Sequence, residues 1–133
     1  MSSHDPAYQF ARDGAVALRD VLSADAIRQL RAGIDANLAA PSSNAKVASS
    51  ANDPGRFAED FCCWQENADY RALIWQSKLP HLAAELMGSR TVRLYHDHML
   101  TKTAGTRQAT PWHQDQPYYN VEGTQTISFW IPA

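Results

Sequence analysis

The pattern of apolar residues changes at about residue 91, and this change limits the folds that the chain can adopt. Before it, apolar residues recur at helical spacing, most clearly between residues 24 and 39. After it, runs rich in β-branched and aromatic residues predict strands. Helices followed by strands are typical of an α+β fold, in which helices flank a sheet. We therefore predict a single α+β domain over residues 1–133, mostly helical in 1–90 and with its first core strands in 91–133.

Capping residues and prolines set the ends of the expected elements. Ser23 and Asn67 are suitable helix N-caps, and Pro80 fits the first turn of a third helix. The expected helices cover 24–39, 68–76 and about 80–88. The expected strands cover 15–18, 56–64, 91–101 and 125–131, with a turn at 10–14 and a long loop at 41–55.

The composition is typical of a soluble globular protein. Hydrophobic residues make up 44% of the chain and charged residues 20%. The net charge of −2 comes without runs of like sign, so neither a nucleic-acid partner nor a basic membrane-binding patch is expected. No apolar stretch approaches the roughly 20 residues of a membrane span, and the N-terminus lacks the features of a signal peptide. We therefore expect a cytoplasmic protein.

Cys62 and Cys63 are neighbours in the sequence, which does not suit an ordinary structural disulfide. We interpret them as strand residues that face opposite ways, one toward the core and one outward. No second pair of ligands stands at the spacing that a thiolate metal site would need.

The sequence ends at Ala133, directly after the strand expected at 125–131. Two or three long strands cannot close a sandwich or barrel, and they would leave an apolar edge unpaired. We therefore expect either that the sequence is the N-terminal part of a longer protein or that a partner chain completes the sheet.

His113 and Asp115 are the first candidate metal ligands. In an extended strand, residues two apart point to the same face, so both side chains could meet one ion. An imidazole and a carboxylate are two of the three ligands in the 2-His-1-carboxylate triad of non-haem Fe(II) oxygenases. The pattern alone also fits a surface histidine bonded to a nearby aspartate, but the flanking prolines and aromatic residues favour the metal site.

His96 and His98 are a rival pair of ligands. They too would share one face of a strand, as in a cupin-like metal site. The alternatives are half-exposed strand histidines, or partners that orient groups near a metal without binding it.

Three stretches in the last third of the chain resemble the phytanoyl-CoA dioxygenase family. The resemblance extends over about 95–132, with a weaker match at 10–18 and in the helix after it. It implies a double-stranded β-helix (a cupin-like jelly roll) around Fe(II), with 2-oxoglutarate as co-substrate and hydroxylation of a small-molecule substrate. The stretches are His98-Met-Leu-Thr-Lys-Thr-Ala-Gly105, Thr110-Pro-Trp-His-Gln-Asp-Gln-Pro-Tyr-Tyr119 and Ile127-Ser-Phe-Trp-Ile-Pro132.

The resemblance also implies roles for single residues. His113 and Asp115 match the first two iron ligands, while Met99 and Trp130 match positions that line the 2-oxoglutarate pocket and Gln114 lies within the ligand motif. Ordinary core packing is the other interpretation of Met99 and Trp130. The family's second histidine ligand, and the arginine that pairs with the distal carboxylate of 2-oxoglutarate, would lie beyond residue 133. Related halogenases have a small residue where this chain has Asp115, so a carboxylate there favours hydroxylation.

The sequence thus predicts an Fe(II)/2-oxoglutarate-dependent hydroxylase, with the oligomeric state left open. We expect residues 1–133 alone to bind metal weakly and to be inactive, because they supply two ligands rather than three. The alternative function is a non-catalytic β-rich binding module in which the His-x-Asp motif is a vestige.

Overall fold

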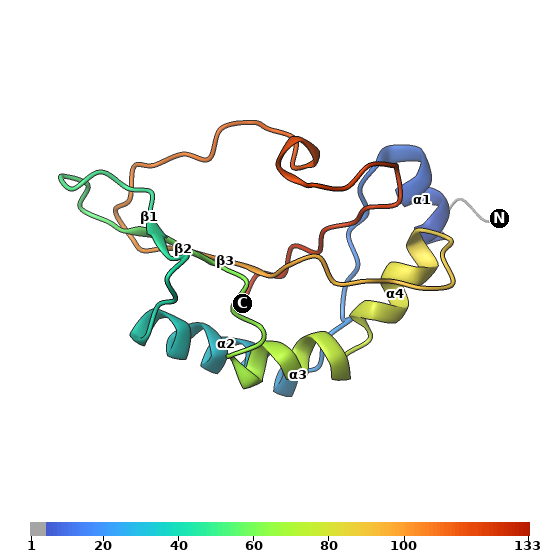
Figure 1. Cartoon of the computed structure of the whole chain (residues 1–133), viewed down its shortest axis with the longest axis horizontal. Coiled ribbons are helices and arrows are strands. Elements are labelled where there is room, and N and C mark those ends of the chain that lie inside the picture. Colours follow the sequence, from blue (N-terminus) through green and yellow to red (C-terminus); the bar gives the residue numbers. More distant parts are fainter. Residues whose placement is uncertain (1–4) are drawn as a thin grey trace.

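The computed structural model of the protein describes residues 5–133 (Figure 1). This part contains helices and a small antiparallel sheet, so the predicted α+β class is confirmed. The helices are α1 (Pro6–Asp13), α2 (Ala24–Ala39), α3 (Ala68–Gln76), α4 (Leu79–Leu86) and the short 3-10 helix η1 (Gln116–Tyr118). The sheet has the order β1 (Lys46–Val47), β2 (Phe57–Phe61), β3 (His98–Lys102).

The capping residues of α2 and α3 act as the sequence predicts. The Ser23 side chain accepts a hydrogen bond from the backbone N–H of Ala26, at 3.2 Å. The Asn67 side chain accepts from the N–H groups of Asp69 and Tyr70. Each cap satisfies donors that a helix leaves unpaired in its first turn, which fixes where the helix begins.

The N-terminal segment corrects two predictions. Residues 10–14 were predicted as a turn, yet residues 10–13 form the end of α1. This helix begins after Asp5, a side-chain N-cap, and is followed by Gly14, the C-cap, with a φ of 74°. Gly14 adopts this left-handed conformation without the cost that a side chain would add. Residues 15–18 were predicted as a strand and form none, because no neighbouring strand among the described residues pairs with them.

The sheet is shorter than the sequence predicts. β2 lies within the expected 56–64, whereas β3 covers only the end of the expected 91–101. β2 and β3 are antiparallel, with Asp60 opposite Met99. The stretch 125–131 was predicted as a strand but is irregular, since within the described residues no strand lies beside it to supply hydrogen bonds. The jelly roll therefore stays a prediction.

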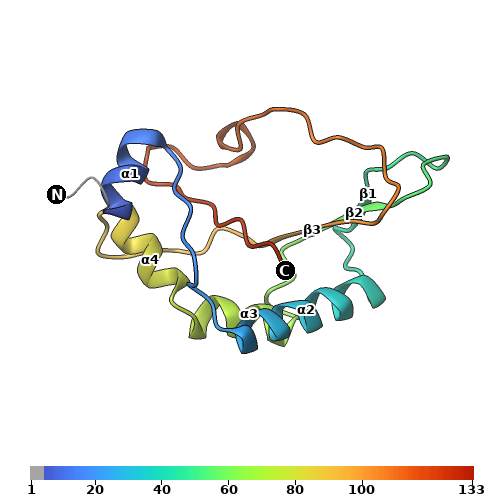
Figure 2. The same ribbon diagram turned by 180° about the vertical axis from the view of Figure 1, so that it is seen from behind.

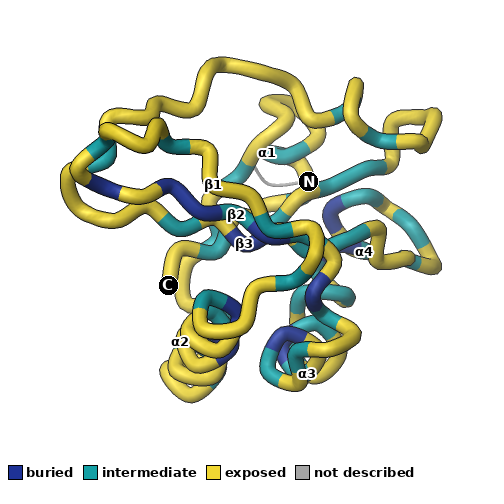
Figure 3. Tube along the Cα trace, turned by 60° about the vertical axis from the view of Figure 1, so that its left-hand side comes forward, coloured by how far each residue is buried: buried dark blue, intermediate teal, exposed yellow. Residues whose placement is uncertain are grey.

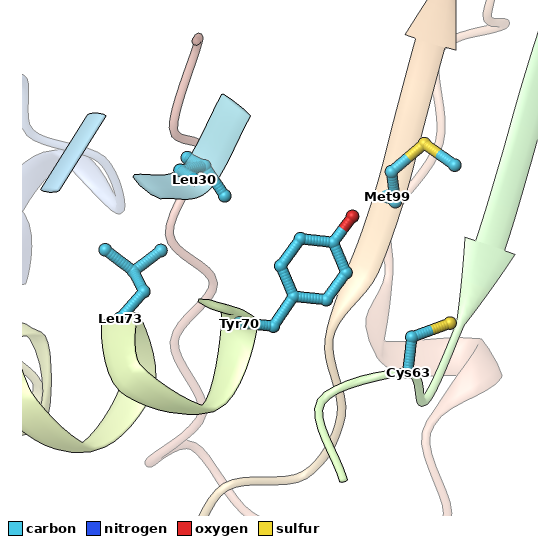
Figure 4. Packing of buried hydrophobic residues seen from close by; sticks show 5 residues of the cluster. All are labelled: Leu30, Cys63, Tyr70, Leu73 and Met99. Atoms are coloured by element: carbon cyan, nitrogen blue, oxygen red, sulfur yellow. The ribbon is translucent and has the colours of Figure 1, made fainter. Parts of the chain in front are cut away.

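The core lies between α2, α3 and one face of the sheet (Figures 3 and 4). Its buried members are contributed by helices and strands that are far apart in the sequence, and Figure 4 shows the Tyr70 ring between the helices and β3. Because side chains alternate along a strand, Asp60 and Met99 face this core while Phe61 and His98 face the other side. The buried members are Leu30, Cys63, Tyr70, Leu73 and Met99.

The cysteine pair behaves as predicted at the level of single side chains. Cys62 is exposed, Cys63 is buried, and both are free. They follow β2 rather than lying within it, and Cys62 has a φ of 59°. Burial raises the pKa of the Cys63 thiol to about 11, so this thiol stays protonated and packs as an apolar group.

A long irregular segment follows β3 and makes up the rest of the chain. It runs over the side of the sheet opposite α2 and α3, as both views show (Figures 1 and 2), and Ile131 returns to pack against the core. The segment includes η1 and the candidate ligands. Among the described residues, no helix is long and apolar enough to cross a membrane.

Candidate metal centre

The sequence predicted His113 and Asp115 in an extended strand. They lie instead in the irregular segment just before η1. Asp115 has helical backbone angles, φ −75° and ψ −32°, because the chain turns here into η1. The two side chains nevertheless meet, with His113 Nε2 at 3.1 Å from Asp115 Oδ1. Both side chains are accessible, at 43% and 50% relative exposure, so an ion could reach them from solvent.

A second contact decides which nitrogen of His113 can bind a metal. Nδ1 lies 2.8 Å from the carbonyl oxygen of Pro111. A carbonyl oxygen only accepts, so Nδ1 carries the proton and the neutral ring has its lone pair on Nε2. The lone pair on Nε2 thus points toward Asp115. The tautomer protonated at Nδ1 is the one that lets His113 bind a metal through Nε2.

The distance between Nε2 and Oδ1 fits a shared cation. Two ligand atoms at about 2.1 Å from one metal and at right angles to each other are about 3 Å apart. The structure has 3.1 Å, between two atoms that both accept. The same distance suits a salt bridge when the imidazole is protonated. The donor set therefore fits two neighbouring positions around a divalent ion.

The other oxygen of Asp115 has a different partner. The hydroxyl of Tyr119 donates to Oδ2 at 3.3 Å, and the same hydroxyl lies 3.3 Å from Ser128 Oγ. A hollow of about 440 Å³ opens beside these groups. It is lined by residues 114–116, Tyr119 and residues 126–128.

The rival pair, His96 and His98, lies near the Asp115 side of the site, where the His96 ring is 5.8 Å from the Tyr119 ring. His98 faces away from the core, with its ring stacked on Phe61 at 3.9 Å and Nε2 3.3 Å from Glu59 Oε2. Burial lowers the pKa of His98, and the neighbouring Glu59 only partly opposes that shift. Within residues 5–133, no group of three or more His, Cys, Asp or Glu side chains is placed to hold a metal. His96 and His98 therefore do not complete a three-ligand set with His113 and Asp115.

The three residues expected at the co-substrate pocket lie in different surroundings. Gln114 lines the hollow beside Asp115. Met99 is buried in the core, on the face of β3 opposite His98. Trp130 is largely exposed. The structure thus places only Gln114 beside the ligand pair.

Lys102 has specific contacts that hold the irregular segment. It lies at the end of β3, where its ammonium group donates to Gln108 O and Thr110 Oγ1, each at 3.1 Å. The same group is 4.5 Å from the centre of the Phe57 ring. Lys102 therefore ties the segment leading to His113 back to the sheet.

Sequence reasoning did not single out Tyr119 or Ser128. The motif Pro-Tyr-Tyr was read only as a stiff aromatic setting, and nothing in it distinguishes Tyr119 from Tyr118. The difference appears once η1 forms, since Tyr119 then points back to Asp115 while Tyr118 is exposed.

A family model described as phytanoyl-CoA dioxygenase (PhyH) matches residues 10–133. Neither a curated protein nor a solved structure matches the chain. The match covers the helices, the sheet and the segment that contains His113 and Asp115, and it indicates dioxygenase-type chemistry.

Proposed function

The chain belongs to the phytanoyl-CoA dioxygenase family, and on this premise we propose that it forms part of an Fe(II)/2-oxoglutarate-dependent hydroxylase of small molecules. The proposal includes a jelly-roll core and a cytoplasmic location, as expected from the sequence. The family match indicates dioxygenase-type chemistry. The proposal adds a particular metal, a co-substrate and a pair of ligands.

The observation that carries the proposal is the pairing of His113 Nε2 with Asp115 Oδ1 at 3.1 Å. The carbonyl of Pro111 fixes the histidine tautomer, so two lone-pair atoms converge without a proton between them when the ring is neutral. These two atoms would hold the iron. When bound, Fe(II) with 2-oxoglutarate supplies the oxidising power to hydroxylate an unactivated C–H bond.

The chain's own residues shape the surroundings of this pair. Gln114 presents a carboxamide to the hollow beside Asp115, where it can donate to or accept from a bound molecule. Met99 and Trp130 are proposed to line the co-substrate pocket on the basis of the family resemblance alone. By the family resemblance alone, Asp115 matches the position where related halogenases have a small residue that leaves room for a halide, and a carboxylate there supports hydroxylation as the reaction.

Metal binding by the chain is the first test. Mn(II) titrated into the 133-residue chain and followed by electron paramagnetic resonance should show weak binding by the wild type. Asp115→Ala should lose this binding, because a single histidine remains. Asp35→Ala removes an exposed carboxylate on α2 and is the matched control, which should bind as the wild type does.

Turnover is the second test, made on the protein expressed from its complete reading frame. Succinate release from 2-oxoglutarate, screened against candidate small molecules, should require Fe(II) and should disappear in Asp115→Ala. Full turnover by that variant would refute the assignment. Metal binding absent from both the chain and the complete protein would instead favour a non-catalytic module with a vestigial motif.

A further inference from the structure

We propose that Tyr119 is a positioning residue, which holds Asp115 so that one carboxylate oxygen faces the metal and the other does not. The inference rests on the proposed function, since it assigns a role at the same metal centre. It gives Tyr119 a role that neither the motif nor the family match assigns to it.

The two oxygens of Asp115 have separate partners. Oδ1 lies 3.1 Å from His113 Nε2, and Oδ2 accepts a hydrogen bond from the Tyr119 hydroxyl at 3.3 Å. A carboxylate engaged in this way binds an ion through one oxygen rather than two. Open coordination positions are thereby kept for other ligands.

Ser128 completes the arrangement from the far end of the segment. Its Oγ lies 3.3 Å from the Tyr119 hydroxyl. A tyrosine hydroxyl has one hydrogen, and Asp115 can only accept, so Ser128 donates to Tyr119 while Tyr119 donates to Asp115. The hydrogen bonds thus run in one direction and end on the charged group, which is the order that strengthens them.

The Tyr119 ring is itself held by neighbours that lead into β3. Its centroid is 5.1 Å from that of Tyr95 and 5.8 Å from that of His96. The Tyr95 hydroxyl accepts a hydrogen bond from the N–H of Asn120, the residue after Tyr119. Asp115 lies on an exposed irregular segment, where a free side chain would sample several rotamers. Tyr119 ties it to the end of the sheet.

We expect removal of the Tyr119 hydroxyl to lower the metal affinity moderately. Partners of metal ligands are typically worth about 10- to 100-fold in metal affinity. At 3.3 Å the bond from Tyr119 is longer than the roughly 2.8 Å that is common between oxygens, so we expect a loss near the lower limit, about tenfold.

The experiment compares two tyrosines that are adjacent in the sequence. Tyr119→Phe keeps the ring and removes the hydroxyl, while Tyr118→Phe makes the same change in an exposed neighbour. Mn(II) affinity of the whole chain is measured by electron paramagnetic resonance. The visible spectrum of bound Co(II) reports the geometry of the ligands, and thermal unfolding reports stability. A second variant, Ser128→Ala, leaves the ring and the hydroxyl of Tyr119 in place. It should weaken Mn(II) binding by less than Tyr119→Phe does.

The expected result is a loss of about tenfold in Mn(II) affinity for Tyr119→Phe, with a changed Co(II) spectrum and an unchanged unfolding temperature. Tyr118→Phe should match the wild type. If Tyr119→Phe binds as the wild type does, with the same spectrum, the positioning role is wrong and the proposed function stands. If neither the 133-residue chain nor the protein expressed from its complete reading frame binds Mn(II), the positioning role and the proposed function are both wrong.

Discussion

Asp60 is a carboxylate without solvent contact, at 0% relative exposure, on the face of β2 that meets the core. It accepts hydrogen bonds from the Asn37 side chain and from both the N–H and the hydroxyl of Ser42. The Tyr70 hydroxyl in turn donates to Asn37. These bonds join α2, α3 and the sheet through one buried charge.

We predict that Asp60→Asn lowers the free energy of unfolding by about 2–4 kcal/mol. The new amide brings its own donors toward the donors of Asn37 and Ser42, so buried polar groups lose their partners. Urea unfolding measures the change. Asp35→Asn, on the exposed face of α2, should stay within about 0.5 kcal/mol of the wild type. Equal stability of the two variants would contradict this role.

The same residue predicts a dependence of stability on pH. Desolvation alone would raise the pKa of Asp60, but the hydrogen bonds from Ser42 and Asn37 outweigh it and lower the pKa from 3.8 to about 2. A lowered pKa means that the stabilising contribution is complete above about pH 4 and is lost as the pH falls toward 2. Urea midpoints between pH 5 and pH 2 should fall more steeply for the wild type than for Asp60→Asn. Parallel curves would show that Asp60 is not the group that titrates.

The β1–β2 hairpin is connected to the segment that leads to the candidate ligands. Asp53, in the hairpin turn, accepts hydrogen bonds from the N–H of Arg107 and the hydroxyl of Thr106. Next to it, Gly55 lies so close to this segment that a β-carbon would overlap the nitrogen of Thr106 and approach the carbonyl carbon of Gly105 to 2.6 Å. The contact is between two backbones, and only glycine allows it.

We predict that Gly55→Ala lowers the free energy of unfolding by at least about 2 kcal/mol, since neither backbone can yield locally. Gly14→Ala is the informative comparison. A β-carbon there meets no atom within 4 Å, and only the φ of 74° opposes it, so its cost should be about 1 kcal/mol. Thermal unfolding of both variants ranks them. The reverse order would show that the hairpin turn can move away from residues 105–107.

The elements differ in how far the sequence alone could predict them, and the reason is physical. The bounds of α2 and α3 follow from local signals, because a cap and an apolar period lie within the helix itself. β3 and the stretch 125–131 have similar β-rich sequences, but only β3 lies beside β2. A strand depends on a partner that its own sequence does not specify.

The residues of the candidate site also differ in how far the sequence could predict them. His113 and Asp115 could be found from their spacing and their flanks, although their contact arises at a turn and not in the expected strand. Tyr119 and Ser128 could not be found, because their contact brings together η1 and a distant part of the segment. For Met99 the sequence left both core packing and a pocket role open. Its burial follows from the face of β3 on which it lies, and that face is known only from the register with Asp60.

On the scale of the whole molecule, the chain has two parts with different backbone bonding. Residues up to about 102 contain the four α-helices and the paired strands that the structure describes. In residues 108–133 the structure describes hydrogen bonds between backbone groups only in the turn from Asp115 to Tyr119. Side-chain contacts, such as those of Lys102 and Ile131, hold this second part against the first.

We predict that amide hydrogen exchange will separate the two parts. Amides of α2, α3 and β2 should exchange slowly, because they open only with the core. Amides of 108–133 should exchange within seconds, apart from those near η1. Exchange followed by fragmentation and mass spectrometry resolves these regions. Strong protection over 125–131 would mean that this stretch is paired as a strand in solution, as its sequence predicts.

Trp112 is fully exposed and directly precedes His113. An indole surrounded by water emits at long wavelength, and a paramagnetic ion a few ångströms away suppresses that emission. Occupancy of the His113–Asp115 pair can therefore be followed by fluorescence without any attached dye. A Trp112→Phe variant separates this signal from that of Trp130, the other largely exposed tryptophan of the same segment.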